Sequence, residues 1–103
     1  MTYRVNIRAT AKRDIARARD YYATEASHEV ARFARELRKV VKAVGREPKV
    51  PRVVLADARA WHLKGHFPYE VWYVVFDDLE LVDVVALVHD RQDPEQFTPR
   101  LSS

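Results

Sequence analysis

The sequence contains no cysteine, so the chain can form neither a disulfide framework nor a thiolate metal site. Its first fourteen residues include no apolar run that could act as a signal peptide. No stretch approaches the roughly 20 consecutive apolar residues of a transmembrane helix, and internal repeats and low-complexity segments are lacking. Apolar residues nevertheless make up 48% of the 103 positions. We therefore expect one globular, cytoplasmic domain over residues 1–103.

The charge is distributed unevenly along the chain. Residues 1–52 hold 14 Lys and Arg against 6 Asp and Glu, whereas residues 53–103 hold 4 against 9. The first half is therefore basic and the second half acidic, although the whole chain has a net charge of only +3. Two interpretations remain open: a solvated, Arg-rich helix face, or a basic surface that meets nucleic acid or an acidic protein.

The first half predicts one strand followed by two helices. Apolar and polar residues alternate over residues 3–7, which indicates a strand with one buried face. Residues 11–22 then place apolar side chains at steps of three and four, the spacing of a single helix stripe. Thr10 is a candidate N-cap for this helix.

A stronger apolar stripe over residues 30–44 predicts the second helix, with Ser27 as a candidate N-cap and Gly45 and Pro48 as stop signals. The link between the two helices is short, which favours an antiparallel hairpin. A basic stripe with the same spacing lies roughly opposite the apolar one. It consists of Arg32, Arg35, Lys39, Lys42 and Arg46.

The second half predicts three strands in a meander. We interpret residues 47–59 as a loop, because its prolines exclude a central strand. Residues 61–64, 70–76 and 79–88 are expected to form strands, and the last two are apolar on both faces and therefore central. Residues 94–103 are expected to form a polar tail with at most one helical turn.

The predicted element order is β-α-α-β-β-β. Two consecutive helices and a run of strands indicate an α+β fold, in which a helical hairpin packs on one face of a mostly antiparallel four-stranded sheet. We expect the functional residues on the uncovered face of this sheet and at the polar turn of residues 89–93.

Several short motifs follow one another in a defined order along the chain. They are Thr10-Ala11-Lys12-Arg13-Asp14, Leu63-Lys64-Gly65, Phe67-Pro68-Tyr69, and Val88-His89 before Asp93-Pro94. In this order and spacing they resemble the RelE/ParE superfamily, the toxins of bacterial type II toxin–antitoxin pairs. The resemblance covers nearly the whole chain. It implies the α+β fold described above, and a toxin that is neutralised when its antitoxin binds to it directly.

The RelE branch of this superfamily cleaves messenger RNA on the ribosome without a metal or cofactor. If the chain acts in this way, the resemblance and the residue chemistry indicate six candidates: His62, Lys64, His66, Tyr73, His89 and Arg91. His89 could act as acid or base, because an unperturbed histidine titrates near neutrality. Arg91 and Lys64 could hold phosphate. Structural roles fit these positions too: Tyr73 alternates with core residues, and His89 sits at a strand end.

Two positions depart from the superfamily pattern. Glu70 stands where Arg commonly follows the Pro-Tyr pair, and Gln92 stands where the final turn commonly carries Arg. Both changes remove positive charge from a surface that would have to bind RNA. The departures favour the ParE branch, whose members poison DNA gyrase and need no catalytic residue. Ribosome-dependent cleavage of messenger RNA is the alternative.

Both branches imply a cognate antitoxin as partner. Its partly disordered tail would fold on the toxin, and the basic stripe of the second helix would suit an acidic segment of that tail. We expect the apolar contacts of the tail in the gap between hairpin and sheet. A third hypothesis is a plain nucleic-acid-binding domain, which the basic hairpin allows and the acidic sheet opposes.

Overall fold

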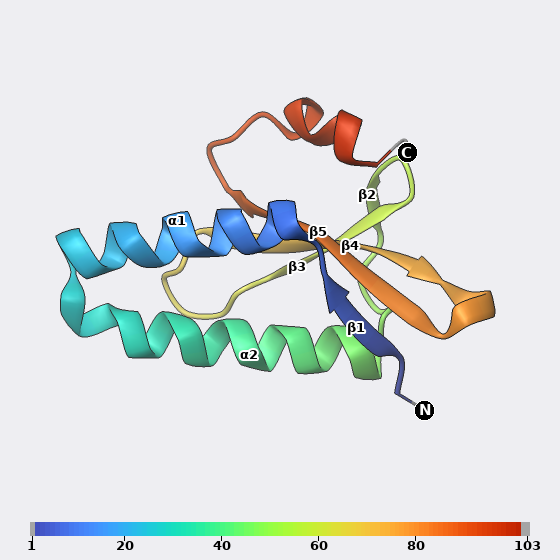
Figure 1. Cartoon of the computed structure of the whole chain (residues 1–103), viewed down its shortest axis with the longest axis horizontal. Coiled ribbons are helices and arrows are strands. Elements are labelled where there is room, and N and C mark those ends of the chain that lie inside the picture. Colours follow the sequence, from blue (N-terminus) through green and yellow to red (C-terminus); the bar gives the residue numbers. More distant parts are fainter. Residues whose placement is uncertain (1, 102–103) are drawn as a thin grey trace.

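The computed structural model describes residues 2–101 and shows two antiparallel helices packed on a five-stranded sheet (Figure 1). The main elements are β1 (Arg4–Ile7), α1 (Ala9–Glu25), α2 (Val30–Arg46), β2 (Val53–Leu55), β3 (Ala58–His62), β4 (Tyr69–Phe76) and β5 (Leu81–His89). Short 3-10 turns form η1 (Ser27–Glu29), η2 (Asp77–Leu79) and η3 (Pro94–Arg100). Within the described residues, neither helix is long and apolar enough to cross a membrane.

The strands lie in the order β1-β5-β4-β3-β2. Only β1 and β5 are parallel, and the other neighbours are antiparallel. The predicted α+β class and mostly antiparallel sheet are therefore confirmed, but the predicted number of four strands is wrong. The additional strand, β2, lies inside the expected loop at residues 47–59. It has three residues, too few to show an alternation, and it is an edge strand, where nearby prolines are tolerated.

The main core lies between the helices and the sheet. Phe33, Leu37, Val40 and Val44 of α2 are buried there, which confirms the apolar stripe of the second helix. Helix α2 ends at Arg46, between the two expected stop signals Gly45 and Pro48, although Gly45 itself is still helical. This glycine is buried where the helix meets β1, and a Cβ at its position would lie 2.9 Å from a Val5 methyl carbon.

A β-bulge in β5 determines which side chains face the helices. Tyr73 of β4 pairs with Val84 and Trp72 pairs with Ala86, so Val85 is the extra residue. Val82 and Val84 before the bulge, and Leu87 after it, belong to the core under the helices. The bulge therefore shifts the alternation by one residue, and the next residue in phase with Leu87 is His89. This places His89 on the helix side of the sheet.

The second face of the sheet is covered by η3, which is drawn in red in Figure 1. Phe97 is 4% exposed, and its ring centroid lies 5.8 Å from that of Trp72. The expected polar tail at residues 94–103 is therefore wrong for residues 94–100, because one aromatic side chain fixes an otherwise polar segment on the sheet. Residues 102–103 lie outside the described residues. The expectation of an uncovered sheet face is corrected in the same way.

The two expected helix caps have other roles. Helix α1 begins at Ala9 with Arg8 at its N-cap position, and the Thr10 hydroxyl donates a hydrogen bond to the Val85 carbonyl at the bulge, 3.2 Å away. Ser27 begins η1, and Glu29 precedes α2 without a side-chain cap. The Thr10 hydroxyl therefore satisfies a backbone carbonyl of the sheet, a role that short hydroxyl side chains can take as readily as capping.

Candidate functional site

The ends of β3, β4 and β5 bring two of the predicted site regions together. His62 pairs with Glu70 across β3 and β4, and Tyr69 pairs with His89 across β4 and β5. As a result, the His62 Nε2 atom lies 3.0 Å from a carboxylate oxygen of Asp90, in the turn that also contains Arg91. This end of the sheet is therefore the region where side chains predicted from the sequence converge.

The His62 ring is held at both nitrogens. Nδ1 lies 2.6 Å from the Leu63 carbonyl oxygen, and Nε2 lies beside the Asp90 carboxylate. Both partners can only accept hydrogen bonds, so the arrangement suits the imidazolium, which donates from both nitrogens. Burial would lower the pKa of His62, but the bonds to Leu63 and Asp90 outweigh it and raise the pKa above its usual value. His62 thus forms an ion pair with the turn.

The hydrogen bonds of His89 define which of its ring nitrogens carries the proton. Its Nδ1 atom accepts a hydrogen bond from the Arg91 backbone N–H at 3.0 Å, so the neutral ring carries its proton on Nε2. The His89 backbone N–H donates to the Gln92 side-chain oxygen at 2.8 Å. Gln92 therefore stabilises the turn with its oxygen and keeps its amide NH₂ group available. These two hydrogen bonds join the backbone of the turn to the side chains of His89 and Gln92.

Three of the other candidates do not join this group. Tyr73 is fully buried, and its hydroxyl donates to the Pro48 carbonyl at 2.8 Å. Burial raises the pKa of Tyr73 to about 12. Lys64 is exposed in the loop after β3, and His66 pairs with Glu29 at 2.8 Å. The six side chains that the sequence suggested for RNA cleavage therefore do not form one cluster.

Glu70, which replaces the Arg expected from the resemblance, has a partner within the chain. The Trp72 Nε1–H group donates to its carboxylate at 3.2 Å, on the face of the sheet that η3 covers. With Asp90 nearby at the ends of the strands, the side chains around His62 are acidic. This part of the sheet offers poor electrostatic conditions for an RNA phosphate.

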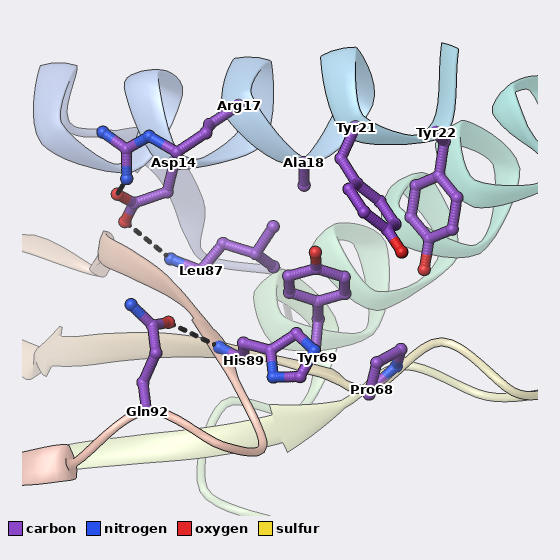
Figure 2. A pocket seen from close by; sticks show the side chains of 10 residues that line it. All are labelled: Asp14, Arg17, Ala18, Tyr21, Tyr22, Pro68, Tyr69, Leu87, His89 and Gln92. Carbon is purple, nitrogen blue, oxygen red and sulfur yellow. Dashed lines mark hydrogen bonds and ion pairs between the residues drawn. The ribbon is translucent and has the colours of Figure 1, made fainter. Parts of the chain in front are cut away.

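A cleft of about 570 Å³ opens on the opposite, helix side of the same strand ends (Figure 2). Arg17, Tyr21 and Tyr22 reach it from α1, and Tyr69 and His89 reach it from β4 and β5. Pro68, Leu87 and Gln92 complete the wall, together with Asp14 and Ala18. The volume lies within the usual range for small-ligand sites in proteins.

Asp14 anchors the inner end of this cleft. Its carboxylate accepts the Leu87 backbone N–H at 3.1 Å and the Arg100 guanidinium at 2.6 Å, and its side chain is only 6% exposed. Arg100 also donates to the Val85 carbonyl at 3.1 Å, so one ion pair joins α1, the β-bulge and η3. Arg17 lies 3.9 Å from the same carboxylate, but its side chain is 76% exposed.

The basic stripe of α2 is exposed, as a surface role requires. All five of its members are solvent-accessible, although Arg32 lies 3.5 Å from Glu29 and Lys39 lies 3.2 Å from Glu36. A groove of about 540 Å³ runs beside it, between α1 and α2. The groove has an apolar floor that includes Ile15, and basic side chains along it. The basic members are Lys12, Arg19, Arg38 and Lys42.

The gap between hairpin and sheet, where we expected apolar contacts for an antitoxin, is filled by the main core. The accessible apolar surface of the hairpin lies instead between its two helices. This correction has a simple cause. The apolar stripes of both helices are wide enough to cover the sheet, and their edge residues, such as Ile15 and Val41, remain only partly buried.

This fold also occurs in solved toxin structures. The ParDE system of P. aeruginosa matches with a TM-score of 0.72 at 12% identity, over 85% of this chain and 96% of that one. The RelBE2 complex of Mycobacterium tuberculosis matches with a TM-score of 0.61 at 20% identity, over 86% of this chain and 99% of that one. The isolated E. coli RelE toxin matches with a TM-score of 0.51 at 14% identity, over 96% of this chain and 98% of that one. The fold is therefore that of the RelE/ParE superfamily of toxins.

A family model assigns the chain more closely. Residues 5–94 match the model described as the ParE toxin of the type II toxin-antitoxin system parDE. The match spans most of the sequence, so the chain belongs to the ParE toxin family and is a toxin of the type II toxin–antitoxin class. A comparison with curated protein sequences gave no match.

Sequence reasoning missed most of the cleft. Asp14 was recognised only as part of a motif, although its position three residues after Ala11 and four before Ala18 places it on the buried stripe of α1. A carboxylate on a buried stripe needs a cationic partner, which could have pointed to Arg100. Tyr21, in contrast, is 58% exposed and carries no periodic signal.

Proposed function

We propose that this toxin acts on DNA gyrase. The observation that carries the proposal is the chemistry of the two positions where a nuclease of this superfamily would hold cations. Glu70 binds the indole of Trp72, and Gln92 binds the backbone of His89. Cleavage of a phosphodiester needs preorganised positive charge around the developing phosphorane, and an acid and an amide do not supply it. The match to the ParE family model supports the same proposal.

A gyrase target makes the toxin a binding protein without catalytic residues. The buried phenol of Tyr73 and the ion-paired ring of His62 are then parts of the scaffold. Gyrase works on the chromosome, so this proposal places the toxin in the cytoplasm. Residues 1–103 would act as one toxin domain.

The experiment is a gyrase assay with purified, antitoxin-free protein. We expect the toxin to block supercoiling of relaxed plasmid and to accumulate linear DNA in the presence of gyrase and ATP. The same preparation is added to a translating extract, where we expect reporter messenger RNA to remain intact. Normal supercoiling at molar excess of toxin, with cleavage of messenger RNA that Lys64→Ala or His89→Ala abolishes, would contradict the proposal and favour the ribosome as target.

The antitoxin, in this proposal, binds the helical hairpin. The exposed basic stripe and the groove between the helices lie on neighbouring surfaces, and Lys42 belongs to both. An apolar floor with cationic rims fits an amphipathic segment that has acidic residues beside its apolar ones. Such a segment would fold on binding, and the cations of the rim would fix its register and speed its association.

Charge reversal tests this surface. We expect Arg35→Glu/Lys39→Glu to weaken antitoxin binding about tenfold, which corresponds to about 1.4 kcal/mol. The matched control is Arg52→Glu/Arg91→Glu, which makes the same charge change at two exposed positions outside the hairpin. Equal affinity of both double variants in titration calorimetry would mean that the stripe is only a solvated helix face.

A further inference from the structure

The cleft between α1 and the ends of β4 and β5 displays hydrogen-bond donors. The neutral ring of His89 carries its proton on Nε2, because Nδ1 accepts the Arg91 N–H. Gln92 uses its oxygen within the turn and keeps two amide protons. Arg17, whose side chain is 76% exposed, contributes a guanidinium that lies beside Asp14 (Figure 2).

The carboxylate that lines the cleft, Asp14, already has hydrogen-bond donors within the protein. The Asp14 carboxylate accepts hydrogen bonds from the Leu87 N–H and from the Arg100 guanidinium, which also balances its charge. Arg17 contributes a second positive charge to the cleft. Its guanidinium lies 3.9 Å from Asp14, which is longer than a hydrogen bond. The electrostatic character of the lining favours a ligand that is rich in acceptors and carries negative charge.

Tyrosine rings form the other part of the lining. The rings of Tyr21 and Tyr22 meet edge to face at 5.5 Å, and Tyr69 meets His89 in the same way at 5.1 Å. Burial raises the pKa of Tyr22 to about 12 and also raises that of Tyr69, so both phenols stay protonated and can donate hydrogen bonds. Tyr21 is 58% exposed and offers an open ring face. A flat aromatic ring could stack there.

From these observations we infer that the cleft binds one nucleotide unit. The base stacks on the ring of Tyr21, and the phosphate accepts hydrogen bonds from the guanidinium of Arg17 and from His89 Nε2–H. The volume of about 570 Å³ suits a ligand of this size. The nucleotide is either free in solution or part of a single strand, since both present the same base and phosphate chemistry. The site is separate from the acidic side chains around His62 and does not depend on gyrase being the target.

The test is a binding titration with the whole purified protein. The probes are guanosine and adenosine 5′-monophosphates, the corresponding nucleosides, inorganic phosphate, and fluorescent five-nucleotide single strands of DNA and RNA. We expect monophosphates or strands to bind, and nucleosides and phosphate alone to bind at least tenfold more weakly, because each lacks one half of the recognised unit. Strands that bind no better than monophosphates would identify a free nucleotide as the ligand, and tighter strands would identify a nucleic acid.

Two exposed side chains give variants that should fold normally, which circular dichroism can verify. We expect Arg17→Gln and Tyr21→Ala each to weaken binding about fivefold, the effect of losing one charge-assisted contact or one stacking partner. The matched control is Arg19→Gln, which removes the same charge from the same helix but lines the other groove.

Four results would overturn the inference. One is no binding of any nucleotide or strand at millimolar concentration. Another is equal weakening by Arg19→Gln, which would indicate unspecific attraction to a basic helix. The third is that phosphate competes as well as a monophosphate, which would assign the cleft to a simple anion. The fourth is that an acidic peptide with one aromatic residue binds where nucleotides do not, which would assign the cleft to a protein partner.

Discussion

Replacing Arg100 with Met should destabilise the protein strongly, although this residue lies three positions from the end of the chain. Its guanidinium makes two contacts with the Asp14 carboxylate, at 2.6 and 3.3 Å, and one with the Val85 carbonyl at 3.1 Å. It also lies 4.9 Å from the centre of the Phe97 ring. Methionine keeps an unbranched apolar stem but has no guanidinium, so the substitution removes mainly the charge and its hydrogen bonds.

The size of the effect follows from burial. Removing one partner of a fully buried ion pair costs about 3–5 kcal/mol, because the other charge stays behind without compensation. Here the carboxylate is 6% exposed, but the Arg100 side chain is 26% exposed, so water can reach part of the site. We therefore expect a loss of about 2–3 kcal/mol. Out of a total stability of about 5–15 kcal/mol, this is a large fraction.

Urea unfolding measures this loss, and the fluorescence of Trp72, which packs on Phe97, reports it. We expect the midpoint to fall by about 2 M for a slope near 1.3 kcal/mol/M. Arg17→Met is the matched control. It removes an arginine 3.9 Å from the same carboxylate, but 76% of that side chain is exposed, so the change should stay within about 0.5 kcal/mol. Equal effects of the two variants would refute the reasoning, since burial would then not decide the strength of the pair.

Three further substitutions test other parts of the fold. The pKa of His62 is raised in the folded state, so its pair with Asp90 stabilises fully below about pH 6.5 and is lost as the pH rises through the folded pKa. His62→Gln should thus lower the melting temperature at pH 5.5 more than at pH 8.5. Gly45→Ala should destabilise by about 1 kcal/mol in urea, because overpacking against Val5 exceeds the gain in helix propensity. A more stable variant would show that β1 can move away. Tyr73→Phe should cost about 1–2 kcal/mol by thermal unfolding through one buried hydrogen bond, and unchanged stability would mean that water replaces the hydroxyl.

The elements that were predictable from the sequence are those whose side chains repeat with a clear period. The stripe of α2 and the alternation in β1 predicted the helix and the strand within one residue at most boundaries. Strand β2 was missed because three residues cannot establish a period. The covering of the second sheet face was missed because it depends on one aromatic residue, Phe97, in a polar segment. Such an isolated contact has no sequence signature.

The candidate site was less predictable, and the β-bulge explains why. Counting alternation along β5 without the extra residue Val85 assigns His89 to the wrong face of the sheet. The sequence gives no signal for the bulge, because a strand that is apolar on both faces shows no alternation that an extra residue could interrupt. The pairing of His62 with Asp90 was likewise invisible, because the two residues are 28 positions apart and meet only through the register of three strands.

The β-bulge also connects the separate features of the molecule. Its free carbonyl at Val85 is satisfied by the Thr10 hydroxyl and by Arg100, and its neighbour Leu87 donates to Asp14. The same ion pair therefore fixes η3 on one face of the sheet and balances the acidic group of the cleft on the other face. If the pair were broken, the Asp14 carboxylate would lose its buried cation and would attract Arg17 away from a ligand. Stability and the donor character of the cleft thus depend on one buried contact, so variants of Arg100 should weaken ligand binding in the cleft even where the protein remains folded.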